Sequence, residues 1–248
     1  MLKYYLILLL CIFSSLVHAK SPDAQTIAIA APHITSLIEE DQSGIYQGIL
    51  NEAISDMPFK IIQSYTPYKR ALVSFEQGHT DYIYSFTQVM QEKLGNENII
   101  ASFPLGAFAY YMFSPLDQSP LTSSSQLKGL NVGAVHVHEN YYKHRLSEKI
   151  KLDKVYKDAQ NLKKLKVKRI DVMIAALPDL QPFVDQLSYS AKHPLVESYD
   201  RITCHNKALT QSFLDELSPR LKRMKDSGRY KEISGELFFD FDSEYKQQ

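Results

Sequence analysis

Thr26-Ile27-Ala28-Ile29-Ala30-Ala31 is a short apolar run that ends at Pro32 and predicts a buried β-strand. Apolar residues then recur at helical spacing from Tyr46 to Met57, which predicts an amphipathic helix. Residues 59–62 predict a second strand, Pro67 opens a second helix, and residues 81–86 predict a third strand. Because strands alternate with helices, this part of the chain predicts a parallel α/β sheet.

A second run of alternating strands and helices follows. Residues 107–113 predict a further strand, and the next stretch, 114–125, is rich in Ser, Thr and Pro. We therefore place a boundary between two lobes near residue 113. Beyond it the sequence predicts a strand over 130–137, a helix over 139–149 and more elements of both kinds. The C-terminal stretch has helical periodicity, and its last part is too short and polar to form a domain alone, so we expect it to pack on an earlier lobe.

Residues 1–19 have the architecture of a secretory signal peptide. Lys3 precedes a near-continuous apolar run over 4–13, and Val17 and Ala19 are the small or medium residues expected before a cleavage site. The run is shorter than the ~20 apolar residues of a membrane anchor. We expect cleavage after Ala19 and export of the mature chain to the periplasm.

Charge and cysteine content restrict the class of protein. The chain has 28 Lys and Arg and 28 Asp and Glu, which disfavours a nucleic-acid-binding protein. Loss of the signal peptide removes Lys3 and no acid, so the mature chain has a net charge of −1. It retains one cysteine, Cys204, and cannot form an intramolecular disulfide.

Basic residues are concentrated in one stretch of the chain. Residues 143–169 contain 11 Lys and Arg but only three acids, Glu148, Asp153 and Asp158. Two interpretations stay open, namely a solvated helix face and a docking surface for a membrane partner or an anionic surface.

Five short motifs carry a resemblance to a known family. They are Gly-Ile-Tyr-Gln-Gly-Ile at 44–49, residues 67–71 with 78–81, residues 127–133, residues 161–165 with 169–171, and residues 226–230. In this order they resemble the bacterial family 3 extracellular solute-binding proteins, the periplasmic binding proteins that deliver amino acids and similar polar solutes to importers. The resemblance covers the whole mature chain.

The resemblance implies an α/β fold of the type II periplasmic-binding-protein kind, with two α/β lobes and a ligand cleft between them. The C-terminal helices would return to the first lobe. With the boundary near residue 113, lobe 1 comprises residues 20–113 and 202–248, and lobe 2 comprises residues 114–201.

The same resemblance implies a function. We expect a monomeric protein that captures a small polar or aromatic solute by hinge closure, for the membrane permease of an ABC transporter or for a sensor kinase. No catalytic constellation, cofactor site or metal site is expected, and Cys204-His205 lacks an orienting group for a thiol nucleophile. Two alternatives stay open. One is an orphan receptor that docks on a membrane sensor kinase, and the other is a dehydratase-like enzyme with Glu92, Glu139 or Asp179 as acid or base.

Both charged anchors of the family's amino-acid site are altered in this sequence. Lys93 stands where the resemblance implies an Arg for the ligand carboxylate, and Lys lacks the planar fork that matches a carboxylate. Ala176 stands where an Asp would receive the ligand ammonium, and Asp179 lies nearby in a different register. We therefore do not expect an ordinary α-amino acid as the ligand.

The remaining candidates follow predicted strands or begin predicted helices, because ligands of α/β sheets bind at the carboxyl ends of the strands. Arg70 fits a surface or interlobe ion pair equally well, and only one of His136 and His138 can face the cleft because they alternate along a strand. The predicted ligand-binding residues are His33, Tyr68, Arg70, Tyr84, Ser85, Thr87, Lys93, His138, Asn140 and Tyr141.

Overall fold

The first lobe is built on a five-stranded mixed sheet. The computed structural model describes residues 25–136 and 138–241, so the predicted signal peptide lies outside the described residues. In the sheet β1 is parallel to β2 and β3, whereas β11 is antiparallel to β3 and β4. The strand order is β2-β1-β3-β11-β4, with β1 at Gln25–Pro32, β2 at Phe59–Thr66, β3 at Tyr82–Tyr84, β4 at Ile99–Ala101 and β11 at Ile202–His205.

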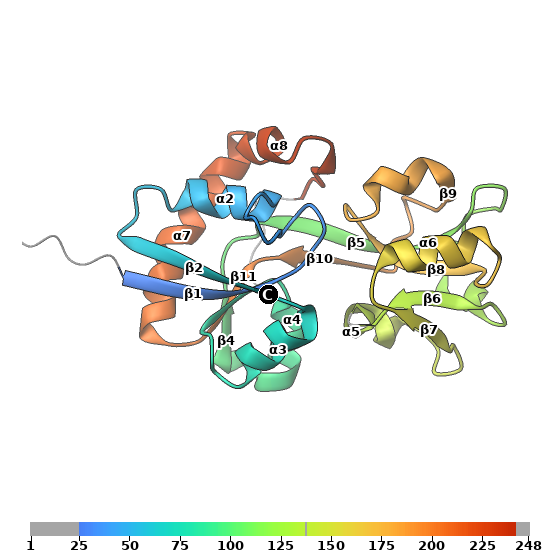
Figure 1. The fold of residues 1–248 in the computed structure, drawn as a ribbon, viewed down its shortest axis with the longest axis horizontal. Helices are drawn as coiled ribbons and strands as arrows, with labels where there is room; N and C mark the ends of the chain where they lie inside the picture. The colour runs from blue at the N-terminus through green and yellow to red at the C-terminus, as the bar shows by residue number, and fades with distance from the viewer. Residues whose placement is uncertain (1–24, 137, 242–248) are drawn as a thin grey trace, which may run out of the picture.

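Helices cover both faces of this sheet (Figure 1). The side chain of Ile29 in β1 packs in a buried cluster that includes Ile49 and Phe213, and its neighbour Ala30 packs in a second cluster that includes Phe75. Successive strand residues point to opposite faces, so β1 is buried on both sides. The helices are α2 at Ile45–Ala53, α3 at Tyr68–Glu76, α4 at Thr87–Leu94, α7 at Ala208–Asp226 and α8 at Arg229–Ser234.

The second lobe has its own sheet, in the order β10-β5-β8-β6-β7. Strand β6 is parallel to β7 and β8, whereas β5 is antiparallel to β8, β10 and the short β9. The strands are β5 at Gly106–Pro115, β6 at Val132–Val135, β7 at Leu152–Val155, β8 at Val172–Leu177, β9 at Leu187–Ser188 and β10 at Val196–Asp200. The helices are α5 at Glu139–Tyr142 and α6 at Asp158–Lys166, with 3₁₀ turns η3 at Ser124–Leu127, η4 at Lys143–Arg145 and η5 at Gln181–Gln186. Two further 3₁₀ turns belong to lobe 1, namely η2 at Asn96–Asn98 before β4 and η6 at Gly235–Leu237 after α8.

The chain passes between the lobes at β5 and β10, which lie side by side (Figure 1). Residues 109–113 of β5 pair with residues 173–177 of β8. The change of sheet therefore occurs at about Gly106, before the boundary near residue 113 that the sequence predicts. The chain returns at Arg201, between β10 and β11, and α7 and α8 then pack on the first lobe. Within residues 25–136 and 138–241, no helix combines the length and the hydropathy of a membrane span.

Candidate ligand-binding site

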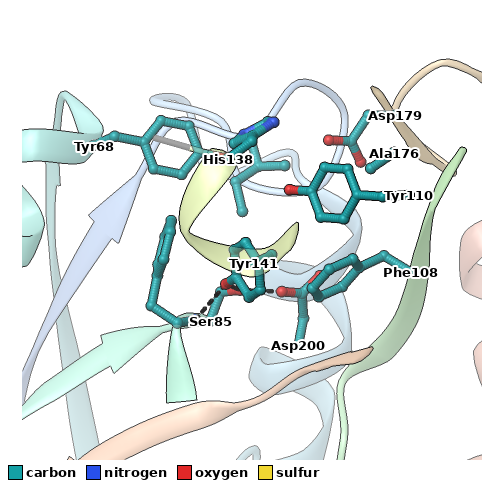
Figure 2. Close-up of a pocket in the computed structure, with 11 residues that line it drawn as sticks. Tyr68, Ser85, Phe108, Tyr110, His138, Tyr141, Ala176, Asp179 and Asp200 are labelled. Carbon is teal, nitrogen blue, oxygen red and sulfur yellow. Dashed lines mark hydrogen bonds between the residues drawn. The ribbon is translucent and has the colours of Figure 1, made fainter. Parts of the chain in front are cut away.

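A small pocket lies between the two lobes (Figure 2). Lobe 1 contributes the loop after β1, the start of α3 and the turn between β3 and α4. Lobe 2 contributes β5, α5 and the segment at the end of β8. The lining residues are Ile34, Tyr68, Ser85, Phe86, Phe108, Tyr110, His138, Tyr141, Ala176, Asp179 and Asp200.

The turn between β3 and α4 forms one wall of the pocket and has an unusual backbone. Ser85 and Phe86 have φ values of 66° and 60°, in the left-handed region that costs residues with a side chain ~1–3 kcal/mol. The surrounding chain holds this conformation, because the Ser85 N–H donates to the carbonyl of Arg201 at 2.7 Å. Such conformations are concentrated at functional sites, where the structure around them offsets their cost.

Asp200 ties the end of β10 to lobe 1. Its buried carboxylate accepts hydrogen bonds from the Tyr46 hydroxyl at 2.8 Å and from the Ser85 hydroxyl. Burial raises the pKa of Asp200 to about 6, although both hydroxyl donors act in the opposite direction. The carboxylate therefore stands at the point where the chain returns from lobe 2, with two hydroxyl groups directed at it.

Tyr141 reaches from α5 of lobe 2 to the strained turn of lobe 1. Its hydroxyl accepts a hydrogen bond from the backbone N–H of Phe86 at 3.2 Å and lies 3.5 Å from the Ser85 hydroxyl. Its ring packs on Phe108, with the ring centroids 5.1 Å apart. Burial raises the pKa of Tyr141 far above its usual range, so the phenol stays neutral. A side chain of one lobe thus occupies a backbone donor of the other.

Aromatic rings form most of the remaining wall. Tyr68 lies on one side of the pocket and Tyr110 on the opposite side, and His138 is in edge contact with both, at centroid distances of 5.6 and 5.8 Å (Figure 2). His138 is only 6% exposed, and its Nδ1 has no hydrogen-bond partner among the described residues. Burial lowers the pKa of His138 to about 4, so the imidazole is neutral at physiological pH.

Asp179 follows β8 and gives the pocket its second carboxylate (Figure 2). Burial, together with the negative charges of Asp158 and Asp200, raises its pKa well above the usual range for Asp. Burial also raises the pKa of Asp158, at the start of α6, to about 6. None of the described residues that line the pocket is a Lys or an Arg. The site is therefore aromatic and acidic, with no cationic side chain on its walls.

The structure brings four of the predicted binding residues together in this pocket. They come from three separate parts of the chain and are Tyr68, Ser85, His138 and Tyr141. Each lies at the end of a strand or the start of a helix, as the sequence analysis expects of cleft residues.

The other predicted residues lie outside the lining. Arg70 is exposed on α3, and Asn140 is partly buried on α5. Lys93 is exposed and pairs with Glu76, and the His33 ring hydrogen-bonds to the Tyr65 hydroxyl.

Tyr84 and Thr87 lie on the core side of the turn between β3 and α4. Tyr84 is fully buried in the core of lobe 1. The Thr87 hydroxyl lies 2.6 Å from that of Thr203 in β11, and the Thr203 hydroxyl also donates to the Ser85 carbonyl. Thr87 thus stabilises the turn through Thr203 and does not line the pocket.

The carboxylates proposed for an enzyme are dispersed. Glu92 is exposed on α4, and Glu139 pairs with Lys154 at 2.6 Å. Asp179 alone of the three lines the pocket. Cys204 is buried, and burial raises the pKa of its thiol, which disfavours a reactive thiolate. No group of three or more metal-ligating side chains occurs in the described part of the chain.

Sequence reasoning missed several lining residues. Phe108 and Tyr110 are two positions apart on β5 and so share one face of the strand, a signal that is visible in the sequence. The boundary that the sequence predicts near residue 113 places this strand in lobe 1, away from the predicted cleft residues. For Asp200 the sequence gives only a weak indication of a cleft position, an acid beside an apolar strand end. For Ile34 it gives no indication.

No protein-family model matches the chain, and no curated protein matches it. Solved structures do. One is the substrate-binding protein of an amino-acid ABC transporter, at a TM-score of 0.64 and 15% identity over 86% of this chain and 99% of that one. Another is an ancestral amino-acid-binding protein that is a precursor of cyclohexadienyl dehydratase. It matches at a TM-score of 0.66 and 14% identity, over 86% of this chain and 95% of that one.

A third structure is a histidine kinase sensor domain with similarity to periplasmic binding proteins, at a TM-score of 0.63 and 13% identity over 88% of this chain and 97% of that one. At these identities the likeness concerns the fold. The predicted fold class is confirmed, and this chain has the two-lobe α/β fold of type II periplasmic binding proteins.

Proposed function

We propose that the mature chain is a periplasmic solute-binding protein that captures a small solute between its lobes by hinge closure and delivers it to an importer or a sensor. The observation that carries this proposal is the pocket itself, to which both lobes contribute side chains. A ligand in such a pocket contacts both lobes at once, so its binding free energy favours their closed arrangement. The segments around Gly106 and Arg201 are the hinge.

Two features support a binding function. The fold is shared with a transporter's substrate-binding protein and with a sensor domain. The buried Nδ1 of His138 and the carboxylate of Asp179 are polar groups in an aromatic pocket, an arrangement typical of small-molecule sites. Of the three acids that the sequence offers for an enzyme, Glu92 and Glu139 lie outside the pocket lining and Asp179 alone lies in it.

A thermal-shift screen of residues 20–248 against amines, amino acids, dipeptides and organic acids tests the proposal. A ligand at 100 times its Kd adds about 2.7 kcal/mol to the free energy of unfolding, which is roughly 5–11 °C for a chain of this size. Ala176→Leu places a larger side chain in the pocket and should abolish the shift. The matched control is Ala159→Leu, at an exposed position of α6. No shift with any compound, or equal shifts in both variants, would contradict a solute site between the lobes.

Experiments in cells distinguish a role in an importer from a role in a sensor. If the protein serves an importer, a strain without it loses uptake of the radiolabelled ligand. If it serves a sensor, uptake persists and the transcriptional response to the ligand is lost. The basic stretch 143–169 remains a candidate docking surface, although Lys154 and Lys164 within it already form ion pairs with Glu139 and Asp153.

A further inference from the structure

We propose that the ligand of this pocket is a small organic cation, an amine or a quaternary ammonium compound without a carboxylate, held beside Asp179 within the aromatic walls. The inference rests on the proposed solute-binding function of the same pocket. It adds the chemical class of the ligand, which follows from the charge and the surfaces of the lining residues.

The charges around the pocket have one sign. Asp179 and Asp200 line it, and Asp158 lies close enough to affect the ionisation of Asp179. Asp200 already accepts two hydroxyl donors. The ion pairs within residues 25–136 and 138–241 include none to Asp179. A cation beside Asp179 would supply the missing positive charge and favour the ionised carboxylate.

An anionic group has no comparable partner. The Phe86 N–H at the start of α4 is a natural donor for a carboxylate, but the Tyr141 hydroxyl occupies it. Lys93 pairs with Glu76 on the surface, and Arg70 is exposed on α3. A ligand carboxylate would therefore meet Asp179 and Asp200 without compensation, and its repulsion would cost binding free energy. This argument excludes amino acids as well as simple acids.

The aromatic side chains of the pocket are a second, independent reason to expect a cationic ligand. Five aromatic side chains line the pocket, and ring faces attract ammonium groups electrostatically. Tyr68 stands on one side, with Tyr110 and Asp179 opposite it (Figure 2). The tyrosines stay neutral because burial raises their pKa values, and His138 stays neutral because burial lowers its own. His138 therefore adds no positive charge. Its Nδ1, which has no hydrogen-bond partner among the described residues, can accept a hydrogen bond from an ammonium N–H.

Calorimetric titration of the mature chain with two matched sets of probes tests the inference. Choline is compared with 3,3-dimethylbutan-1-ol, which has the same shape and no charge. Phenethylamine is compared with phenylalanine, which adds a carboxylate. We expect at least one of the two cations to bind, with a Kd about tenfold or more below that of its partner, because cation–π contacts and the carboxylate act on the cation alone.

Two variants locate the effect. Asp179→Asn should weaken binding of the cation by about 30-fold or more, because a buried charge partner is lost. Asp185→Asn, the same change at an exposed site in η5, should not alter it. Tyr68→Leu should weaken it about 3- to 30-fold, whereas Tyr156→Leu should have no effect because Tyr156 is 83% exposed.

The outcomes separate this inference from the function on which it rests. If phenylalanine or the neutral alcohol binds as well as its cationic partner, or if Asp179→Asn leaves Kd unchanged, the ligand is not a cation and the solute-binding function stands. If neither cation binds while other compounds in the thermal-shift screen do, the inference also fails alone. If no compound of any class binds, both fail.

Discussion

The hydroxyl of Tyr141 lies 3.2 Å from the backbone nitrogen of Phe86, and this hydrogen bond joins lobe 2 to the strained turn of lobe 1. The same hydroxyl is 3.5 Å from that of Ser85, which donates to Asp200. A short chain of hydrogen bonds therefore runs from α5 through the turn to Asp200, at the end of β10. It links closure of the pocket to the segment about which the lobes would rotate.

Tyr141→Phe should shift the ligand-free protein toward an open arrangement. The variant loses the hydrogen bond between the lobes, which is worth about 0.5–1.5 kcal/mol, so the ratio of closed to open molecules falls about 2- to 13-fold. Small-angle scattering should show a larger radius of gyration. Tyr142→Phe is the matched control, because the neighbouring hydroxyl is buried without a partner among the described residues. An unchanged radius in Tyr141→Phe would show that this contact does not hold the lobes together.

Asp158→Asn should change how stability depends on pH. The pKa of Asp158 is about 6 in the folded protein against 3.8 for an ordinary Asp. Between these values the folded state binds more protons than the unfolded state, so this residue's contribution to stability grows as the pH falls, by about 1 kcal/mol from pH 7 to pH 5. His138 acts in the opposite sense, since its lowered pKa means that acid favours the unfolded chain. The pH dependence of wild-type stability therefore combines two opposite effects. Asp200 and Asp179, whose pKa values are also raised, act in the same sense as Asp158.

The comparison of variants isolates Asp158. The free energies of unfolding of Asp158→Asn and wild type are measured with denaturant at pH 7 and pH 5. The variant should be more stable than wild type at pH 7, and this advantage should be about 1 kcal/mol smaller at pH 5. Asp185→Asn, at an exposed position, should keep a constant difference from wild type. A difference for Asp158→Asn that is equal at both pH values would mean that this carboxyl titrates normally.

The architecture was largely predictable because its signals are local. The run before Pro32 and the amphipathic stretch from Tyr46 became β1 and α2 with most of their apolar residues buried. The place of β5 was not predictable in the same way. It is apolar on both faces, and it pairs with β8 about 60 residues later in the chain, a partner that no local pattern specifies. The sequence boundary near residue 113 therefore fell inside this strand.

The site shows the same division. Ser85 and Tyr141 could be nominated because strand ends and helix starts are recognisable in sequence. Tyr110 could not be placed without the pairing of β5, and Asp200 could not be placed without knowing where the chain returns between the lobes. The predicted helix 139–149 is also shorter in the structure, where α5 ends at Tyr142 and a 3₁₀ turn follows.

Tyr84→Phe should stabilise the protein without affecting ligand binding. The Tyr84 side chain is fully buried, and its hydroxyl has no hydrogen-bond partner among the described residues. Removing an unsatisfied buried hydroxyl should therefore add up to about 1 kcal/mol to the free energy of unfolding. Tyr46→Phe is the informative contrast, because its hydroxyl donates to Asp200 and its loss should cost about 1–3 kcal/mol. Tyr84 was a predicted ligand-binding residue, and a weaker ligand affinity in Tyr84→Phe would restore it to the site.

Asp179→Asn should make the ligand-free protein more stable at pH 7. Burial and the charges of Asp158 and Asp200 disfavour the ionised carboxylate, as the raised pKa of Asp179 indicates. A neutral amide of nearly the same shape avoids that cost, and we expect a gain of about 1–2 kcal/mol, or roughly 2–8 °C in Tm. Asp185→Asn should leave Tm unchanged, as calorimetry can establish.

A loss of stability in Asp179→Asn would contradict this reasoning, because it would mean that the ligand-free protein already compensates the charge. If Asp179→Asn gains stability and also loses cation binding, the result would explain why position 179 carries an acid. Groups that serve binding are often held at a cost to the folded state. Here the ligand would offset that cost, since a cation beside Asp179 would remove the electrostatic penalty of the buried carboxylate.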